Sequence, residues 1–178
     1  MRKTVGMPLV PLLVAAILLL AAYNISLPAR EARIQEELTA KMQTILPGST
    51  EFVVEPYAGE DANIKSVHKG ENGFVIETVT RGYADDIRMM VGVSNKGTVT
   101  GLVVLDMAET FGLGAEALSD HVFLAQMLNT SGEAEVGENV DAITGATVTS
   151  KAVVRSVNSA VAFVTGADTE SGATSWGG

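Results

Sequence analysis

The sequence predicts an α+β fold, in which a single N-terminal transmembrane helix is followed by one domain with a mainly antiparallel sheet and flanking helices. Three observations support this prediction. An aliphatic run near the N-terminus carries no charge, four Val/Ile/Thr-rich segments are joined by short turns, and two later segments have apolar residues at helical spacing. With 178 residues, 47% of them hydrophobic, the chain is long enough for one domain with its own core besides the N-terminal helix.

The N-terminal segment has the length of a membrane span. No charged residue occurs between Lys3 and Arg30, and residues 5–25 are mostly aliphatic. A helix needs roughly 20 apolar residues to cross the hydrocarbon core. Because Arg2 and Lys3 precede the run, the positive-inside rule places the N-terminus in the cytoplasm and the rest of the chain outside it. A cleaved signal peptide is the alternative, but the run exceeds the roughly 7–15 apolar residues of such a peptide.

The segment after this span continues as an amphipathic helix, with apolar residues at intervals of three or four in Ile34, Leu38, Met42 and Ile45. Pro47-Gly48 is a typical helix end. We therefore expect a transmembrane anchor over residues 1–27, a juxtamembrane helix over 28–48, the domain over 49–166 and a flexible tail over 167–178.

Four strand-like segments predict an antiparallel meander over residues 64–69, 74–81, 87–94 and 98–106. Asn72-Gly73 is a typical hairpin turn between the first two, and residues 95–97 turn the third into the fourth. The turn-rich, acidic residues 49–63 are expected to form a loop before the sheet.

Two segments after the strands have the apolar spacing of helices. The first, residues 115–129, has its apolar positions at Ala117, Leu118, Val122, Leu124 and Leu128. The second, residues 150–164, places on one face Val153, Val157, Ala160, Val161 and Val164. A polar loop is expected between them.

Composition excludes several kinds of site. The absence of cysteine excludes disulfides, iron–sulfur clusters and thiolate zinc sites, and the two histidines form no zinc-binding pattern, so no metal site is expected. A net charge of −9 argues against nucleic acid as a partner. Residues 97–150 contain eight acids and no Lys or Arg, which favours a solvated acidic face over a cation site.

The stretch from Asp141 to Ser150, D-A-I-T-G-A-T-V-T-S, precedes the second predicted helix and is rich in hydroxyl groups. One interpretation is structural. Thr147 or Thr149 would cap the helix by accepting a backbone N–H, and Gly145 would supply a positive φ in the preceding turn. For such a stretch taken alone, capping is the default interpretation.

The same stretch also has the properties of a phosphate site. A helix start offers unpaired N–H groups and the positive end of the macrodipole. Gly145 and Ala146 leave room for a bulky group near the backbone, and Lys151 adds positive charge in the first turn. A hydroxyl here is therefore suited to carry a phosphate ester.

This stretch resembles the flavinylation motif of the FMN-binding domain in the Rnf and Nqr electron-transport complexes. In that family, a Mg²⁺-dependent flavin transferase uses FAD to link FMN, through its phosphate, to the last threonine of S/T-G-A-T, which corresponds to Thr147. The resemblance implies that the transferase reads Asp141 and Gly145. The other residues that the resemblance places in the FMN site are Thr144, Ala146, Thr149, Ser150 and Lys151.

A second block supports the resemblance. Residues 109–114, E-T-F-G-L-G, are similar to the family's E-T-P-G-L-G loop beside the isoalloxazine ring, with Phe111 in place of the proline. Taken alone, this block would be an ordinary strand-to-helix loop. The resemblance covers nearly the whole chain except its C-terminal tail, and the short chain is more similar to the G subunit of Rnf than to the longer C subunit of Nqr. The flavin contacts that it implies are Glu109, Thr110, Leu113 and Gly114.

The resemblance implies an electron-carrier subunit of a membrane complex that couples ferredoxin–NAD electron transfer to ion pumping. Flavin supplies the electron chemistry, so no catalytic side chain and no independent substrate turnover are expected. The implied partners are the other Rnf subunits, a flavin transferase and the bacterial inner membrane, with the FMN domain on its outer side.

Two other functions fit part of the sequence: a flavinylated domain that serves an extracellular reductase, and a membrane-anchored assembly module without a cofactor. The tail adds a second motif, because residues 168–175, D-T-E-S-G-A-T-S, place Thr174 where Thr147 stands in the first. Only four residues follow Thr174, too few for the helix that would bind the phosphate, so Thr147 is the expected site.

Overall fold

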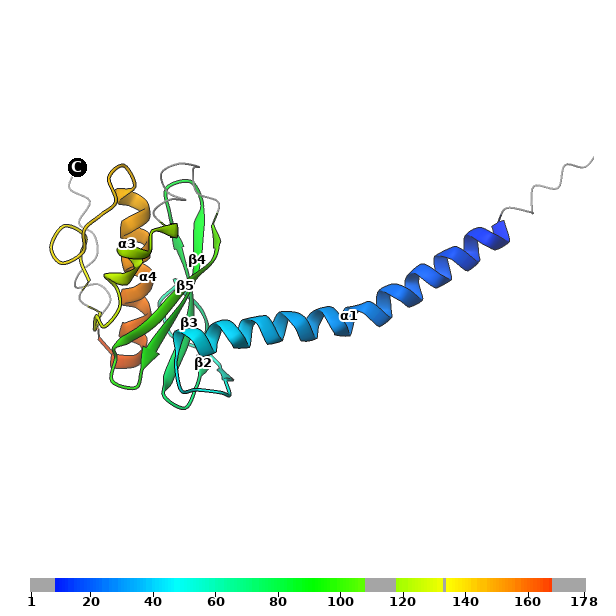
Figure 1. Ribbon diagram of the computed structural model, residues 1–178, viewed down its shortest axis with the longest axis horizontal. Coiled ribbons are helices and arrows are strands. Elements are labelled where there is room, and N and C mark those ends of the chain that lie inside the picture. Colours follow the sequence, from blue (N-terminus) through cyan, green and yellow to red (C-terminus); the bar gives the residue numbers. More distant parts are fainter. Residues whose placement is uncertain (1–8, 108–117, 133, 168–178) are drawn as a thin grey trace, which may run out of the picture. The chain divides into compact units, whose positions relative to one another are not determined.

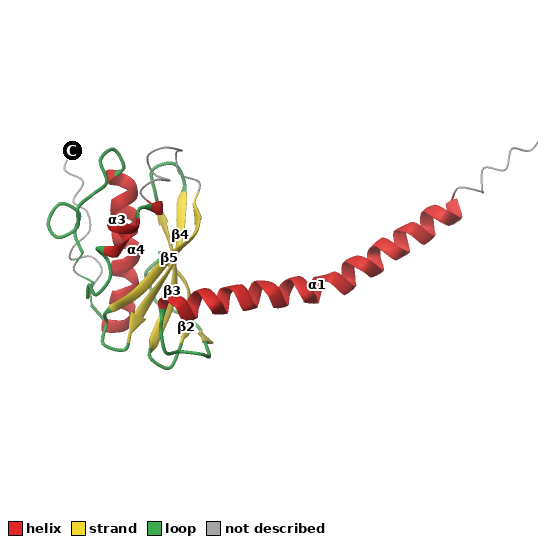
Figure 2. Ribbon diagram, in the orientation of Figure 1, coloured by secondary structure: helices red, strands yellow, loops and turns green. Residues whose placement is uncertain are grey.

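The computed structural model of the chain describes residues 9–107, 118–132 and 134–167. Its contacts divide the chain into two compact units, residues 1–40 and residues 41–178. The described part of the first unit is helical. The second contains a five-stranded sheet with helices, which confirms the predicted α+β class (Figure 2).

Helix α1 (Leu9–Ile45) joins the segment predicted as an anchor to the predicted juxtamembrane helix without a break. Large aliphatic side chains between Leu12 and Leu20 are 51–72% exposed. Within the described residues, no helix combines the length and the hydropathy of a membrane span, so the span predicted over residues 5–25 is not confirmed.

Five strands form one antiparallel sheet, in which each strand pairs with the next along the chain. They are β1 (Val53–Glu55), β2 (Ile64–Lys69), β3 (Gly73–Arg81), β4 (Asp86–Ser94) and β5 (Val99–Met107). Strands β2 to β5 confirm the four predicted strands to within one residue at each end. The prediction of a loop over residues 49–63 was wrong at Val53–Glu55, which form strand β1. This strand escaped prediction because it is short and exposes both Val53 and Val54, so it lacks the alternation of a half-buried strand.

Successive residues of β3 point to opposite faces of the sheet. Ile76 and Thr80 point to the face that helix α4 (Thr147–Thr165) covers, which we call the inner face. Val75 and Glu77 point to the other, or outer, face. The main apolar cluster lies between the inner face and α4 and includes Ile76, Met89, Val91, Val153 and Val157.

Helix α4 confirms the second predicted helix and packs along the inner face (Figure 1). Its predicted apolar positions are buried at Val153, Val157, Ala160 and Val161. The Thr80 hydroxyl donates to the Ala152 carbonyl at 3.0 Å and lies 2.9 Å from the Ser156 hydroxyl. Because these buried polar groups satisfy one another, they fix the position of α4 along β3.

The helix predicted over residues 115–129 is much shorter in its described part, where α3 covers only His121–Ala125. The Asp120 carboxylate accepts hydrogen bonds from the backbone N–H groups of Val122 at 2.8 Å and Phe123 at 3.2 Å, and so begins a new helix. This start turns Phe123 into the core and leaves Val122 78% exposed, so the apolar role predicted for Val122 was wrong.

The outer face receives the last turn of α1, which belongs to the second unit. The Ile45 carbonyl accepts a hydrogen bond from the Thr100 hydroxyl at 2.6 Å. Gly92 and Gly101 face each other across β4 and β5, and a Cβ atom on either would lie 2.4 to 2.7 Å from the Ile45 backbone. These two glycines therefore let the helix end lie directly on the sheet.

Candidate functional site

The stretch predicted to bind a phosphate forms a tight turn that leads into α4. The Ile143 carbonyl accepts a hydrogen bond from the Ala146 N–H at 2.9 Å, which closes a four-residue turn. Gly145 is the third residue of this turn and has a φ of +81°, in the left-handed region that suits glycine. The positive φ expected at Gly145 is confirmed.

Ser150 ties this turn to the first turn of the helix. Its hydroxyl donates to the Ala146 carbonyl at 3.0 Å and accepts from the Ile143 N–H at 3.2 Å. Ser150 and Thr149 are 0% and 1% exposed, so neither hydroxyl is accessible to a bulky group. Ser150 therefore supports the shape of the turn.

Two other hydroxyls of the stretch, those of Thr144 and Thr147, are on exposed residues. Thr147 is the first residue of α4, and the capping position belongs to Ala146, whose side chain has no acceptor. The interpretation that Thr147 or Thr149 caps the helix is therefore wrong. The helix starts without a side-chain cap, and the exposed Lys151 follows in its first turns, which together favour an anion at this end.

A residue outside the motif holds Asp141 in place. The Gln126 side-chain oxygen accepts the Asp141 N–H at 2.8 Å, and the side-chain nitrogen donates to the Asp141 carbonyl at 3.3 Å. Asp141 itself is exposed, so its carboxylate remains accessible. No local pattern in the sequence marks Gln126, because the contact depends on where α3 lies against the loop.

The second predicted block, with Glu109, Thr110, Leu113 and Gly114, lies outside the described residues. The strand that leads to it ends near the start of α4. Met107 of β5 pairs with Ile87, and Ile87 pairs with Thr80, which contacts Ala152. Strand β5 therefore ends at the same end of the sheet at which α4 begins.

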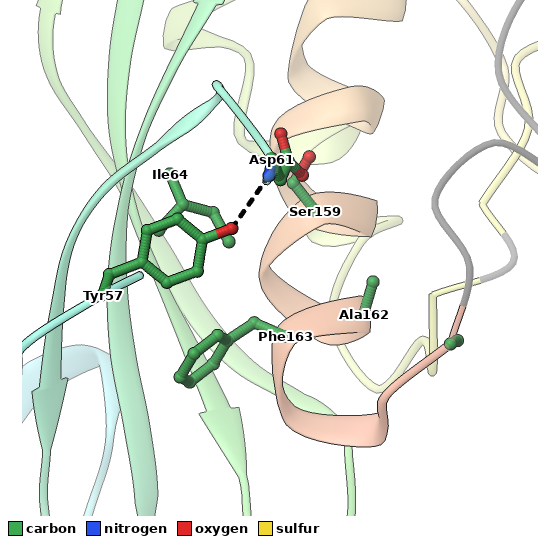
Figure 3. A pocket seen from close by; sticks show the side chains of 7 residues that line it. Tyr57, Asp61, Ile64, Ser159, Ala162 and Phe163 are labelled. Atoms are coloured by element: carbon green, nitrogen blue, oxygen red, sulfur yellow. Dashed lines mark hydrogen bonds between the residues drawn. The ribbon is translucent and has the colours of Figure 1, made fainter. Parts of the chain in front are cut away.

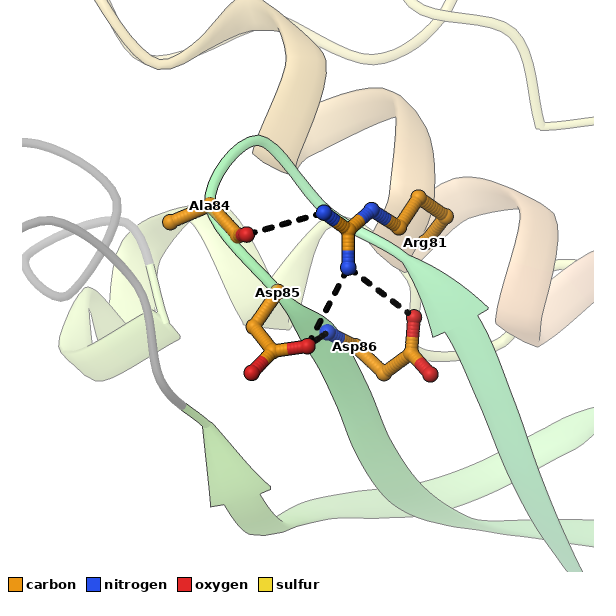
Figure 4. Close-up of polar contacts among 4 residues, drawn as sticks. All are labelled: Arg81, Ala84, Asp85 and Asp86. Atoms are coloured by element: carbon orange, nitrogen blue, oxygen red, sulfur yellow. Dashed lines mark hydrogen bonds and ion pairs between the residues drawn. The ribbon is translucent and has the colours of Figure 1, made fainter.

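The turn between β3 and β4 lies at this end of the sheet as well, and it is charged (Figure 4). The Arg81 guanidinium lies 3.1 Å from the Asp85 carboxylate and 3.5 Å from the Asp86 carboxylate, and it donates to the Ala84 carbonyl at 2.9 Å. Exposed ion pairs add little stability, but these contacts order the turn. Tyr83 at the tip of this turn is 70% exposed, and no sequence motif predicted this aromatic residue.

The outer face carries a separate network of charged groups. The Glu77 carboxylate accepts hydrogen bonds from Arg88 at 3.2 Å and from the Ser66 hydroxyl at 2.8 Å. Burial acts to raise the pKa of Glu77, but these hydrogen bonds outweigh it and hold the pKa below its usual value. Burial also lowers the pKa of His68, against the opposing charge of Glu77. The network lies on the face that α4 does not cover.

Known proteins match the same part of the chain. Residues 82–162, from the β3–β4 turn to the last turns of α4, match the FMN-binding domain family. The G subunit of an ion-translocating oxidoreductase complex from Methanosarcina acetivorans is 33% identical, over 85% of this chain and 87% of that relative.

Two further relatives are G subunits of ferredoxin:NAD⁺ oxidoreductase complexes. The one from the Na⁺-translocating complex of Acetobacterium woodii is 29% identical over 83% of each chain. The one from the proton-translocating complex of Clostridium ljungdahlii is 28% identical over 85% of each chain. The turn at Gly145 and the exposed Thr147 lie within the span that matches the FMN-binding domain. The chain therefore belongs to the family of G subunits of Rnf-type ion-translocating oxidoreductase complexes, whose FMN-binding domain it carries.

Proposed function

We propose that this chain is an electron-carrier subunit of a membrane ion-translocating oxidoreductase complex and that it holds FMN through a phosphoester bond to Thr147. The observation that carries the proposal is the exposed Thr147 at the uncapped start of α4, within the span that matches the FMN-binding domain. The names of the relatives support a place among other subunits of such a complex.

The described residues at this helix start fit a phosphate ester. Ser150 donates the first amide hydrogen bond of α4, to the Ala146 carbonyl at 2.9 Å. The amides of Thr147 and Val148 therefore precede the helical ladder and are groups that a helix start offers to an anion. Gly145 and Ala146 add little bulk beside them, and Lys151 adds a positive charge.

Attachment would join the Thr147 oxygen to the FMN phosphate as the diphosphate bond of FAD breaks, AMP leaves and the hydroxyl proton is released. When bound, the flavin supplies the one-electron chemistry. Thr147 is the tether, the start of α4 neutralises the phosphate, and Gln126 and Ser150 hold the loop before it. The residues proposed beside the flavin ring are Glu109, Thr110, Leu113 and Gly114.

The test is the mass of the protein after co-expression with a flavin transferase. We expect one FMN increment that is lost in Thr147→Val and kept in Thr174→Val, the matched change in the second S-G-A-T motif. The increment should map to peptide 141–155. An increment that survives Thr147→Val and disappears when residues 168–178 are deleted would move the attachment to the tail.

We also propose that residues 5–25 anchor the chain in the bacterial inner membrane, with the N-terminus in the cytoplasm and the FMN domain outside. The exposed aliphatic side chains of α1 support the membrane anchor. The positive charges of Arg2 and Lys3 before the span support the orientation. A reporter enzyme fused after Gly178 should then behave as an exported protein. Reporter activity in the cytoplasm would contradict the orientation.

A further inference from the structure

The end of α4 away from Thr147 borders a cavity of about 160 Å³ (Figure 3). The segment before β2 contributes Tyr57 and Asp61 to its walls, and α4 contributes Phe163. At about 1.5 Å per residue, Phe163 lies about 24 Å along the helix from Thr147. Tyr57 and Phe163 also fall outside the span that matches the FMN-binding domain. The cavity is therefore separate from the proposed flavin site.

Aromatic rings form one side of this cavity. The rings of Tyr57 and Phe163 meet edge to face with their centres 5.8 Å apart, and Phe163 meets Phe74 in the same way at 5.6 Å. The Tyr57 hydroxyl accepts the Asp61 N–H at 3.0 Å, which holds the Tyr57 ring in place. An apolar cavity of roughly 150 Å³ is large enough to bind benzene. The cavity therefore has the size and the walls to receive one further aromatic ring.

The chain leaves α4 at this cavity. Gly166 follows the last residue of the helix with a φ of +69°, and its N–H donates to the Ala162 carbonyl at 2.8 Å. A left-handed residue at this position ends the helix and turns the chain away from its axis. Ala167 comes next and lines the cavity. Residues 168–178 lie outside the described part of the chain, and they therefore begin at the edge of the cavity.

This C-terminal tail contains one large apolar side chain, Trp176, which is also the only tryptophan of the protein. The other residues of the tail are Gly, Ala, Ser, Thr, Asp and Glu. Trp176 follows Ala167 by nine positions, and an extended chain spans roughly 3.3 Å per residue, so the tail is long enough to fold back on the cavity. The entropic cost of closing a loop grows only slowly with its length.

We propose that the indole ring of Trp176 docks in this cavity, against the rings of Tyr57 and Phe163, and closes the tail back onto the end of α4. Burial of a large aromatic surface drives the docking, and edge-to-face or offset contacts with the two rings orient the indole. Docking holds the end of a segment that the sequence alone predicts to be flexible. It does not depend on the flavin, because the two sites lie at opposite ends of α4.

The experiment measures the fluorescence of Trp176 in the full chain in detergent. The chain is expressed without a flavin transferase, and light that tyrosine does not absorb excites the single tryptophan alone. We expect the emission to lie at shorter wavelength than in the urea-unfolded chain, and quenching by acrylamide to be several-fold weaker. Both results should be independent of protein concentration, because the docking occurs within one chain.

Two variants disturb the cavity in opposite ways. Phe163→Ala removes part of its aromatic wall, and Ala162→Gln places a longer side chain in its lining while it keeps a good helix former. Each should move the emission of Trp176 towards that of the unfolded chain and strengthen the quenching. Tyr83→Ala is the matched control, because it removes an exposed ring at the other end of the sheet and should leave the emission unchanged. Circular dichroism checks that each variant keeps its fold.

Three results would overturn the proposal. An emission in the folded parent chain that equals that of the unfolded chain would show that Trp176 is not docked. An emission that changes on dilution would assign the cavity to the tail of a second copy of the chain. An emission at short wavelength that survives both Phe163→Ala and Ala162→Gln would place Trp176 elsewhere, for example in the detergent.

Discussion

The two faces of the sheet differ in what covers them and in what they position. The inner face packs against α4 through a continuous apolar cluster, in which the buried hydroxyls of Thr80 and Ser156 lie 2.9 Å apart. The outer face receives the last turn of α1 at Gly92 and Gly101, and beside this contact it carries the Glu77–Arg88 network. Adjacent residues of one strand therefore face very different surroundings.

This difference separates support from attachment in the domain. The inner face determines where α4 begins, and the proposed flavin attachment depends on that position. The outer face holds the last turn of α1 through the hydrogen bond from the Thr100 hydroxyl to the Ile45 carbonyl. Changes on the inner face should therefore affect both stability and flavin attachment, whereas changes on the outer face should affect stability alone.

The largest effect is expected from a pair of neighbouring methionines on β4. Met89 is 0% exposed within the main cluster, and Met90 is 2% exposed on the outer face. Met89→Ala should lower the free energy of unfolding by about 2–5 kcal/mol because it leaves a cavity beneath α4. Met90→Ala should cost less, because Met90 lies outside that cluster.

Denaturant unfolding measures both changes, and the mass of the co-expressed protein measures attachment. We expect Met89→Ala to lower the fraction that carries FMN, and Met90→Ala to leave it unchanged. Equal losses of FMN in the two variants would contradict the separation of the faces.

A second prediction concerns the contact between α1 and the outer face. A Cβ atom on Gly101 would lie 2.7 Å from the Ile45 Cα atom, so Gly101→Val should displace the helix end and cost about 1–3 kcal/mol. Hydrogen exchange should rise in residues 41–49 while α4 stays protected. Faster exchange in α4 would show that the two faces are coupled.

The same contrast explains which elements the sequence could predict. Strands β2 to β5 follow from their composition and short turns, and α4 follows from its apolar spacing, because each buries a regular pattern on the inner face. The start of α3 does have a local signal, because Asp120 is a typical capping residue. The apolar spacing continues across Asp120, however, and it predicted one long helix instead. The three-residue β1 has no pattern of its own.

The candidate site was predictable only in its local part. The order of Gly145, Ala146 and Thr147 is sufficient to predict a turn followed by a helix start. The clamp of Gln126 on Asp141 joins residues 15 positions apart, and the cavity at Asp61 joins α4 to a segment nearly a hundred positions earlier, as the Asn63–Ser159 hydrogen bond with a separation of 96 shows. Such contacts follow from tertiary packing and leave no local signal.

The third prediction tests the clamp. Gln126→Met keeps the side-chain length but removes both hydrogen bonds to Asp141, each worth about 0.5–1.5 kcal/mol. We expect a lower rate of FMN incorporation with only a small loss of stability. Gln43→Met is the matched control, because Gln43 binds the Thr50 carbonyl at 3.1 Å just after α1. Equal incorporation rates in the two variants would remove Gln126 from the site.

The smallest effect is the pH dependence that the outer face should produce. The pKa of His68 lies below its ordinary value of 6.5, and the pKa of Glu77 lies below its ordinary value of 4.5. The folded state therefore binds fewer protons than the unfolded state at both groups, so stability is greatest above these values and falls as the pH falls. The loss of stability should begin near pH 6.5, where His68 becomes protonated in the unfolded chain, and continue below pH 4.5, where Glu77 does.

Single variants separate the two contributions. His68→Gln should flatten the dependence between neutral pH and about pH 5, and Glu77→Gln should flatten it below that. Both effects should be modest, because these groups are only partly buried and solvent screens them. Urea midpoints across the pH range measure the slopes. At neutral pH, neither variant should change the fraction that carries FMN, since the network lies on the face opposite α4. A stability that rises on acidification, or an unchanged slope in both variants, would show that other groups control the pH dependence.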